Sequence, residues 1–134
     1  MNRYFFVAVS ATLLWSAAHA ENWVAVGSRA DGASQYLDLD SIERNLGLVE
    51  MDRVIDYASP QRTGDGKRFA SQRFRTEIDC GGRAMRQAVI EWRSGAKGSG
   101  TLVTENRVPE DWAIDQFDDF TAPLWQIACE SGAK

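Results

Sequence analysis

The chain has 134 residues, carries a net charge of −4 at pH 7 and contains one histidine, His19. This length suits a single domain built on one hydrophobic core, and the acidic balance argues against a nucleic-acid-binding protein. Because the histidine lies in the leading segment, the rest of the chain lacks the imidazole that a Ser-His-Asp triad, a Cys-His pair or a His-ligated zinc site requires. We therefore expect no enzymatic activity, no cofactor and no metal site.

Residues 1–20 have the pattern of a cleavable signal peptide. Arg3 supplies a basic start, an apolar run extends from Tyr4 to Trp15, and Ala18-His19-Ala20 forms a small-x-small cleavage site. The apolar run is too short to favour a membrane span. We therefore expect an exported mature domain, residues 21–134, with a net charge of −5 after the loss of Arg3 and a periplasmic or secreted location.

The first half of the mature domain is predicted to be mostly extended. Strands are expected at residues 23–27, 35–38 and 46–58, the last with an apolar row formed by Val49, Met51, Ile55 and Tyr57. Asp40, with Glu43 three residues later, has the spacing of a capping box and predicts one helical turn through residue 44. Residues 59–66, which include one Pro and two Gly, predict a loop.

Residues 69–93 predict a long hairpin at the centre of the sheet. In its first strand the even positions from Ala70 to Cys80 are mainly apolar and the odd positions between them are mainly charged. Gly81-Gly82 supplies the turn. The return strand has an apolar row that Arg86 interrupts, formed by Ala84, Ala88, Ile90 and Trp92. A hairpin with one apolar face must pack against another element.

The C-terminal part of the chain is expected to supply that element. Residues 94–100, rich in Gly and Ser, predict a mobile link to a short strand at 101–104. An amphipathic helix is expected to begin at Asp118 or Asp119 and to reach Cys129, because apolar residues between them repeat with helical spacing. Both cysteines lie in the exported part of the chain, which predicts a Cys80–Cys129 disulfide.

Four residues are candidates for contacting a partner: Arg73, Arg75, Arg86 and Trp112. Arginine and tryptophan often dominate the energetics of protein interfaces. Arg73 and Arg75 are expected to face outward and to be solvated or paired with Glu77 and Glu91. Arg86 has two interpretations, a half-buried arginine paired with an acidic residue of the C-terminal segment or an anion-recognising group under the helix. Trp112, in an irregular acidic stretch, is expected to be exposed.

Several short motifs follow one another in a distinctive order: WVAVG, YLDLDSI, VIDYASPQ, SQRFRTEIDC, a Ser/Gly-rich link, a Trp after a Pro, and a final IAC. This order resembles the surface-adhesin protein E family of proteobacteria from Trp23 to Cys129. The resemblance implies an α+β fold, with a single antiparallel sheet of about six strands and a C-terminal helix held on its concave side by a disulfide. It also implies binding, since pathogen members attach to host extracellular-matrix and serum proteins.

The sequence therefore predicts an exported, non-enzymatic binding domain with a protein partner, for which the extracellular matrix is one candidate source, and with no nucleic-acid ligand. The alternative is a periplasmic envelope protein with a structural or small-ligand-carrying role. No adhesive peptide of the family maps residue by residue onto this chain, and no cysteine follows the apolar run as a site for lipid attachment. Display at the cell surface and a periplasmic location both remain open from the sequence.

Overall fold

The computed structural model describes residues 21–130, so the expected signal peptide, residues 1–20, lies outside the described residues, as do residues 131–134. The described chain forms one antiparallel sheet of eight strands. The strands are β1 (Trp23–Ser28), β2 (Ser34–Asp38), β3 (Glu43–Asn45), β4 (Leu48–Arg62), β5 (Arg68–Asp79), β6 (Ala84–Arg93), β7 (Leu102–Asn106) and β8 (Ala113–Ile114).

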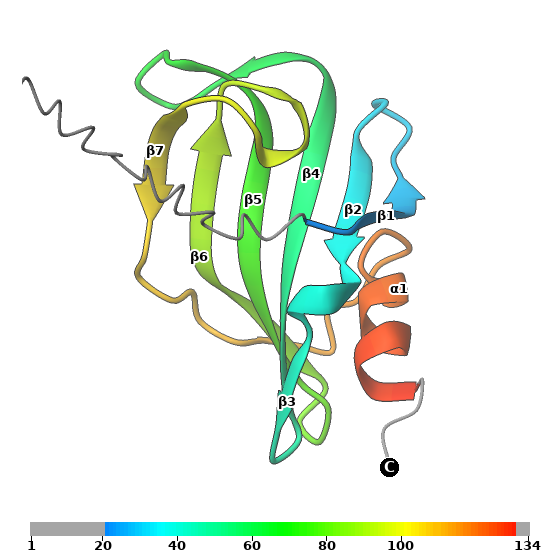
Figure 1. Ribbon diagram of the computed structural model, residues 1–134. Coiled ribbons are helices and arrows are strands. Elements are labelled where there is room, and N and C mark those ends of the chain that lie inside the picture. The colour runs from blue at the N-terminus through cyan, green and yellow to red at the C-terminus, as the bar shows by residue number, and fades with distance from the viewer. Residues whose placement is uncertain (1–20, 131–134) are drawn as a thin grey trace, which may run out of the picture.

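The strand order confirms an antiparallel sheet with the β5–β6 hairpin near its centre, but the expected number of strands was too low. Six strands follow the order β1-β2-β4-β5-β6-β7, and Figure 1 shows them side by side. The two further strands lie off this path, where β3 pairs with β4 and β8 pairs with β6. Both are short segments, of three and two residues, which strand patterns in a sequence do not resolve.

A short helix closes one face of the sheet and is tied to it by the predicted disulfide. The helix α1 (Ala122–Trp125) continues as a π-helical turn, Gln126–Glu130. The expected start at Asp118 or Asp119 is wrong, because the helix begins at Ala122 and its N-cap is Thr121. Asp118 instead stabilises the turn that leads into the helix, since its Oδ1 accepts hydrogen bonds from the backbone N–H groups of Phe120 at 3.0 Å and Thr121 at 2.8 Å. The Cys80–Cys129 disulfide is present, with the two Cα atoms 5.6 Å apart.

The core lies between α1 and the sheet face that we call the inner face. Side chains of β2, β4, β5 and β6 meet the helix in a cluster formed by Leu37, Val49, Met51, Ile78, Met85, Leu124 and Ala128. A second cluster on the inner face consists of Ala33, Ile55, Phe74 and Ile90. In the described part of the chain no helix is long and apolar enough to cross a membrane.

The helical turn expected after Asp40 is wrong in its bounds and in its cap. The turn is a 3-10 helix, Leu39–Ser41, and its cap is Asp38, whose Oδ1 accepts from the N–H of Asp40 at 3.1 Å. The residues after the turn are extended as β3, since pairing with β4 gives their backbone groups the partners that one isolated turn cannot provide.

The expected mobile link, residues 94–100, instead packs on the face opposite the helix, which we call the open face. The Oγ of Ser71 donates to the carbonyl of Gly95 at 2.6 Å and accepts from the N–H of Gly98 at 2.9 Å. The ammonium group of Lys97 lies 4.7 Å from the centre of the Tyr36 ring. This loop, yellow in Figure 1, covers the upper end of β4 and β5.

Candidate binding surface

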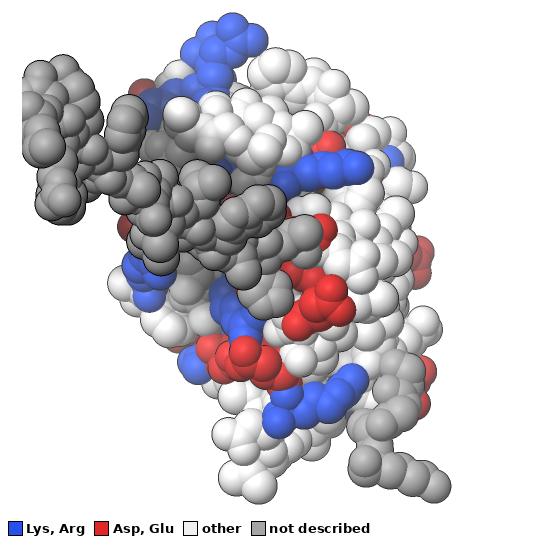
Figure 2. Space-filling view, in the orientation of Figure 1, with Lys and Arg blue, Asp and Glu red and all other residues white. Residues whose placement is uncertain are grey.

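The structure brings the four candidate residues together on the open face of the sheet. Arg73 and Arg75 lie on β5, and Arg86 lies on the neighbouring strand β6. Trp112 precedes β8, which pairs with the lower end of β6. Its ring centre lies 4.4 Å from the guanidinium carbon of Arg86. On the part of this face that is not drawn in grey, Figure 2 shows basic and acidic side chains next to one another.

A β-bulge explains why Arg86 is on this face. Arg75 pairs with Val89, but the next residue, Thr76, pairs with Gln87, so Ala88 is an extra residue in β6. One extra residue reverses the facing of every side chain that follows. The expected apolar row through Arg86 is therefore wrong.

Arg86 also has a different partner from the one expected. Its guanidinium pairs with Glu77 of β5, with Nη2 and Oε2 3.1 Å apart, and not with an acidic residue of the C-terminal segment. The stack of Trp112 on Arg86 covers this pair, which explains why Glu77 is only 8% exposed. Trp112 itself remains 36% exposed, so its predicted exposure is confirmed in part.

Arg73 and Arg75 are held by carboxylates from β4 and from the start of the domain. Arg73 pairs with Glu21 and with Asp52, the latter at 3.3 Å. Arg75 pairs with Asp52 at 3.1 Å and with Glu50 at 3.0 Å. The two arginine side chains are 28% and 24% exposed, so they are fixed in place while part of each still reaches the surface.

The expected pairing of these arginines with Glu77 and Glu91 is wrong. Glu77 is engaged by Arg86, and Glu91 accepts from Arg93 at 2.9 Å. The sequence could not reveal this because the choice of partner depends on strand register across the sheet.

Burial and the neighbouring carboxylates shift the pKa of both Arg73 and Arg75. Burial lowers the pKa of Arg73, but the carboxylates of Glu21 and Asp52 more than offset it, and the pKa lies above its ordinary value. For Arg75 burial is again the largest single effect, and the hydrogen bonds to Glu50 and Asp52 together raise the pKa above its ordinary value. Both guanidinium groups therefore stay charged at any physiological pH.

Two hollows flank these arginines. One has a volume of about 490 Å³ and is lined by Glu21, Asp38, Asp40, Ser41, Glu43, Asp52, Arg73 and Arg75. The other has a volume of about 260 Å³ and is lined by Asp52, Arg73, Arg75, Val89, Glu91 and Arg107. The open face is therefore uneven and charged, and Arg73 and Arg75 line both of these hollows.

Sequence reasoning missed the buried charge of Arg53, on the inner face of β4. It is 5% exposed, and its Nε and Nη1 donate to Thr76 Oγ1 at 2.9 Å and to Gln35 Oε1 at 2.8 Å. Burial lowers the pKa of Arg53 to about 10. The signal was present in the sequence, because residue 53 belongs to the apolar row of β4 by alternation with Met51 and Ile55.

Arg53, and not Arg86, lies on the helix side of the sheet. The side chain of Gln35 links it to the start of the helix, because Gln35 Nε2 donates to the carbonyl oxygen of Phe120 at 2.7 Å. Across residues 21–130 no group of three or more His, Cys, Asp or Glu side chains is placed to hold a metal ion.

Comparison with known proteins relates the whole described domain to one family. The sequence profile described as surface-adhesin protein E matches residues 23–130. Among solved structures, crystal form II of Haemophilus influenzae protein E is similar with a TM-score of 0.67 at 15% identity, over 84% of this chain and 90% of that one. A second structure of Haemophilus influenzae protein E has a TM-score of 0.60 at 15% identity, over 81% and 83% of the two chains. No curated protein sequence matches the chain.

Proposed function

Because the chain belongs to the surface-adhesin protein E family, we propose that it is an exported, non-enzymatic protein that binds a protein partner through the open face of its sheet. The family description, a surface adhesin, supports a protein partner, and an extracellular-matrix protein is the partner class that we propose. The observation that carries the proposal is the gathering of three arginines and one tryptophan on one hollowed face. These residue types combine large contact area with directional hydrogen bonds.

The residues of this face differ in how free they are to contact a partner. Arg73 and Arg75 are committed to carboxylates of their own chain, so they shape the surface and its charge. Arg86 is also paired, with Glu77 alone among the described residues, and its side chain is 27% exposed, close to the 28% of Arg73. The difference lies in Trp112, which is 36% exposed and stacks on Arg86, and in Ile114, 63% exposed, which follows Trp112 in the chain. We therefore place the main contact at Arg86 and Trp112 and assign the arginine pair a supporting role.

The test is binding of the purified domain to immobilised extracellular-matrix proteins. Replacing Arg86 and Trp112 together by alanine should weaken binding at least about tenfold, as the loss of interface hot spots does. The matched control is Lys67→Ala, which removes one cation from an exposed pair with Asp65 at the β4–β5 turn and should leave affinity unchanged. Failure of the unaltered domain to bind any matrix protein, or equal loss in the control, would contradict the proposal.

The alternative of a small-ligand carrier has one observation in its favour. The larger hollow, at about 490 Å³, is within the range of small-molecule sites. Such sites are usually lined by apolar side chains with a few polar groups, whereas seven of the eight residues lining this hollow are charged. The lining therefore favours a polar contact surface over a carrier pocket.

A further inference from the structure

The larger hollow holds more carboxylates than cations. Five of its lining side chains are acidic and two are basic, Arg73 and Arg75. Both arginines are already engaged by Glu21, Glu43, Glu50 and Asp52. Within the described chain, Asp38 and Asp40 have no basic side chain at ion-pair distance. The fold itself therefore leaves negative charge in this hollow unbalanced.

Asp38 is the least exposed of these carboxylates. Its residue is 7% exposed, and its Oδ1 accepts from the N–H groups of Asp40 at 3.1 Å and Asn22 at 3.4 Å. No described residue donates to its Oδ2. Among the described residues only Arg93 Nε is a buried side-chain nitrogen or oxygen without a partner. Asp38 Oδ2 is therefore not sealed from solvent, and it is accessible to a cation that enters the hollow.

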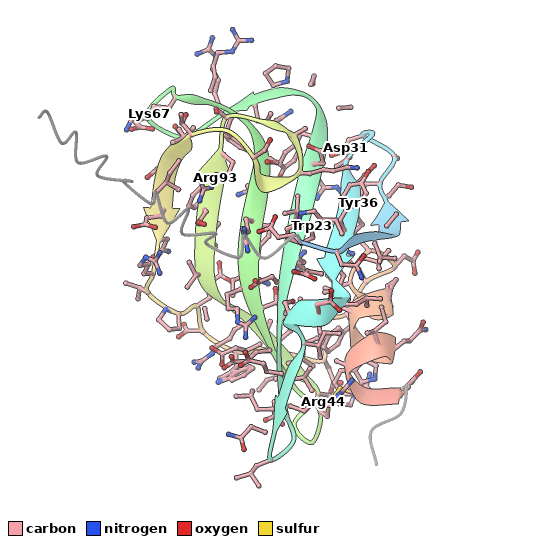
Figure 3. All side chains as sticks on the ribbon, viewed as in Figure 1. Trp23, Asp31, Tyr36, Arg44, Lys67 and Arg93 are labelled. Carbon is pink, nitrogen blue, oxygen red and sulfur yellow. A yellow bond between two sulfur atoms is a disulfide. The ribbon has the colours of Figure 1, made fainter. Side chains whose placement is uncertain are left out.

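Chain geometry places the start of the expected mature domain beside this carboxylate. The backbone nitrogen of Asn22 lies 3.4 Å from Asp38 Oδ1, and successive backbone nitrogens are less than about 4 Å apart. The nitrogen of Glu21 therefore lies within about 7 Å of that oxygen. The Glu21 side chain is fixed in the hollow, because it pairs with Arg73 and accepts from Trp23 Nε1 at 3.0 Å. Figure 3 shows Trp23 in front of the sheet.

We propose that cleavage of the Ala20–Glu21 peptide bond creates an α-ammonium group that occupies this hollow and balances Asp38 and Asp40. Water adds across the carbonyl carbon–nitrogen bond in a reaction catalysed by signal peptidase. The Ala20 carbonyl becomes a carboxylate and leaves with the leader. The Glu21 nitrogen keeps the electron pair of the broken bond and takes up protons, which gives an ammonium at neutral pH. Export thus adds a cation where the fold lacks one.

The first test compares three forms of the protein. Intact mass of the exported protein should show a chain that begins at Glu21. The purified domain with a free α-amino group should melt about 4 °C higher, at low salt, than the same domain acetylated at that group. The difference should shrink by at least half at 1 M NaCl, because salt screens exposed and partly exposed charges.

The variant Asp38→Asn isolates the contact, since an amide oxygen retains the two hydrogen bonds at Oδ1 but not the charge. In this variant the effect of acetylation on the melting temperature should fall by at least half, to about 2 °C or less, by the logic of a double-mutant cycle. The matched control is Asp65→Asn at the exposed β4–β5 turn, which should keep the full difference. If Asp38→Asn does not fold, Asp40→Asn should reduce the difference by about half.

A measurement on the unaltered domain completes the test. Acylation of its α-amino group should be at least about tenfold slower than in the free peptide Glu-Asn-Trp-Val-Ala, because an ammonium held by carboxylates releases its proton less readily. Equal melting temperatures of the free and acetylated forms, equal acylation rates or a mature chain that starts elsewhere would each overturn the proposal. None of these outcomes depends on whether the open face binds a matrix protein.

Discussion

The buried Arg53 offers the sharpest test of how this fold tolerates a charge in its core. Gln35 is fully buried, accepts from Arg53 Nη1 at 2.8 Å and donates through Nε2 to the carbonyl of Phe120 at 2.7 Å. Replacing Gln35 by leucine, which has a similar volume, removes both hydrogen bonds. It also leaves Nη1 of Arg53 without its acceptor inside the core.

The expected loss follows from the two bonds and from the gain in apolar burial. A hydrogen bond to a charged group contributes about 1.5–3 kcal/mol and a neutral one about 0.5–1.5 kcal/mol. The leucine side chain returns about 1 kcal/mol through its additional apolar surface. Gln35→Leu should therefore lower the free energy of unfolding by about 2–3 kcal/mol, a large fraction of the stability of a small domain.

A second substitution should reverse much of this loss. Burial of its charge lowers the pKa of Arg53 from its ordinary value to about 10, and this shift corresponds to about 3 kcal/mol of unfavourable free energy. Arg53→Met removes the charge and fills most of the space. The double variant Gln35→Leu with Arg53→Met should therefore be about 2 kcal/mol more stable than Gln35→Leu alone.

Urea unfolding at pH 7, followed by tryptophan fluorescence, measures both effects, provided that the m-values of the variants agree. Gln116→Leu is the control, because Gln116 is exposed and should change the unfolding free energy by less than about 0.5 kcal/mol. A loss below about 1 kcal/mol for Gln35→Leu would refute the assigned hydrogen bonds. A double variant less stable than the single variant would show that the charge of Arg53 stabilises the core in some other way.

Three further predictions concern stability. Cys80→Ser should lower the free energy of unfolding by about 4 kcal/mol, on the chain-entropy account of a disulfide across 49 residues. Urea unfolding checks this, and the midpoint of the variant should be the same with and without reductant. Arg73→Ala with Arg75→Ala should lower the free energy of unfolding by about 1–2 kcal/mol, since half-buried Asp52 loses both its cations; an unchanged melting temperature would contradict the pairing. Asp118→Ala should cost about 1 kcal/mol at pH 7, because the turn that leads into the helix loses the hydrogen bonds that Asp118 accepts from the N–H groups of Phe120 and Thr121. Hydrogen bonds from the backbone lower the pKa of Asp118, so its contribution should be complete above the unfolded-state pKa near 4 and disappear as pH falls below it; a cost that persists at pH 2 in thermal melts would exclude this cause.

The local pattern of the sequence was sufficient for the elements that repeat over many residues. The alternation in β5 and in most of β4 predicted long strands with one apolar face, because a side-chain period of two leaves no other way to bury those residues. Helical spacing predicted the C-terminal helix, although the helix begins at Ala122 and not at Asp118 or Asp119, and two cysteines allowed only one disulfide within the chain. These local signals were enough to predict an α+β fold in which a disulfide joins the helix to the sheet.

Tertiary structure decided what depends on register. One extra residue at Ala88 turned Arg86 from the inner face to the open face, and no periodicity before that residue indicates the change. Arg73 and Arg75 took their partners from β4 and from Glu21 because strand pairing placed those carboxylates nearest. Ion pairs, bulges and hollows are properties of segments that meet across the sheet, so the sequence by itself determined which residues form the strands and only the folded sheet decided which charges they share.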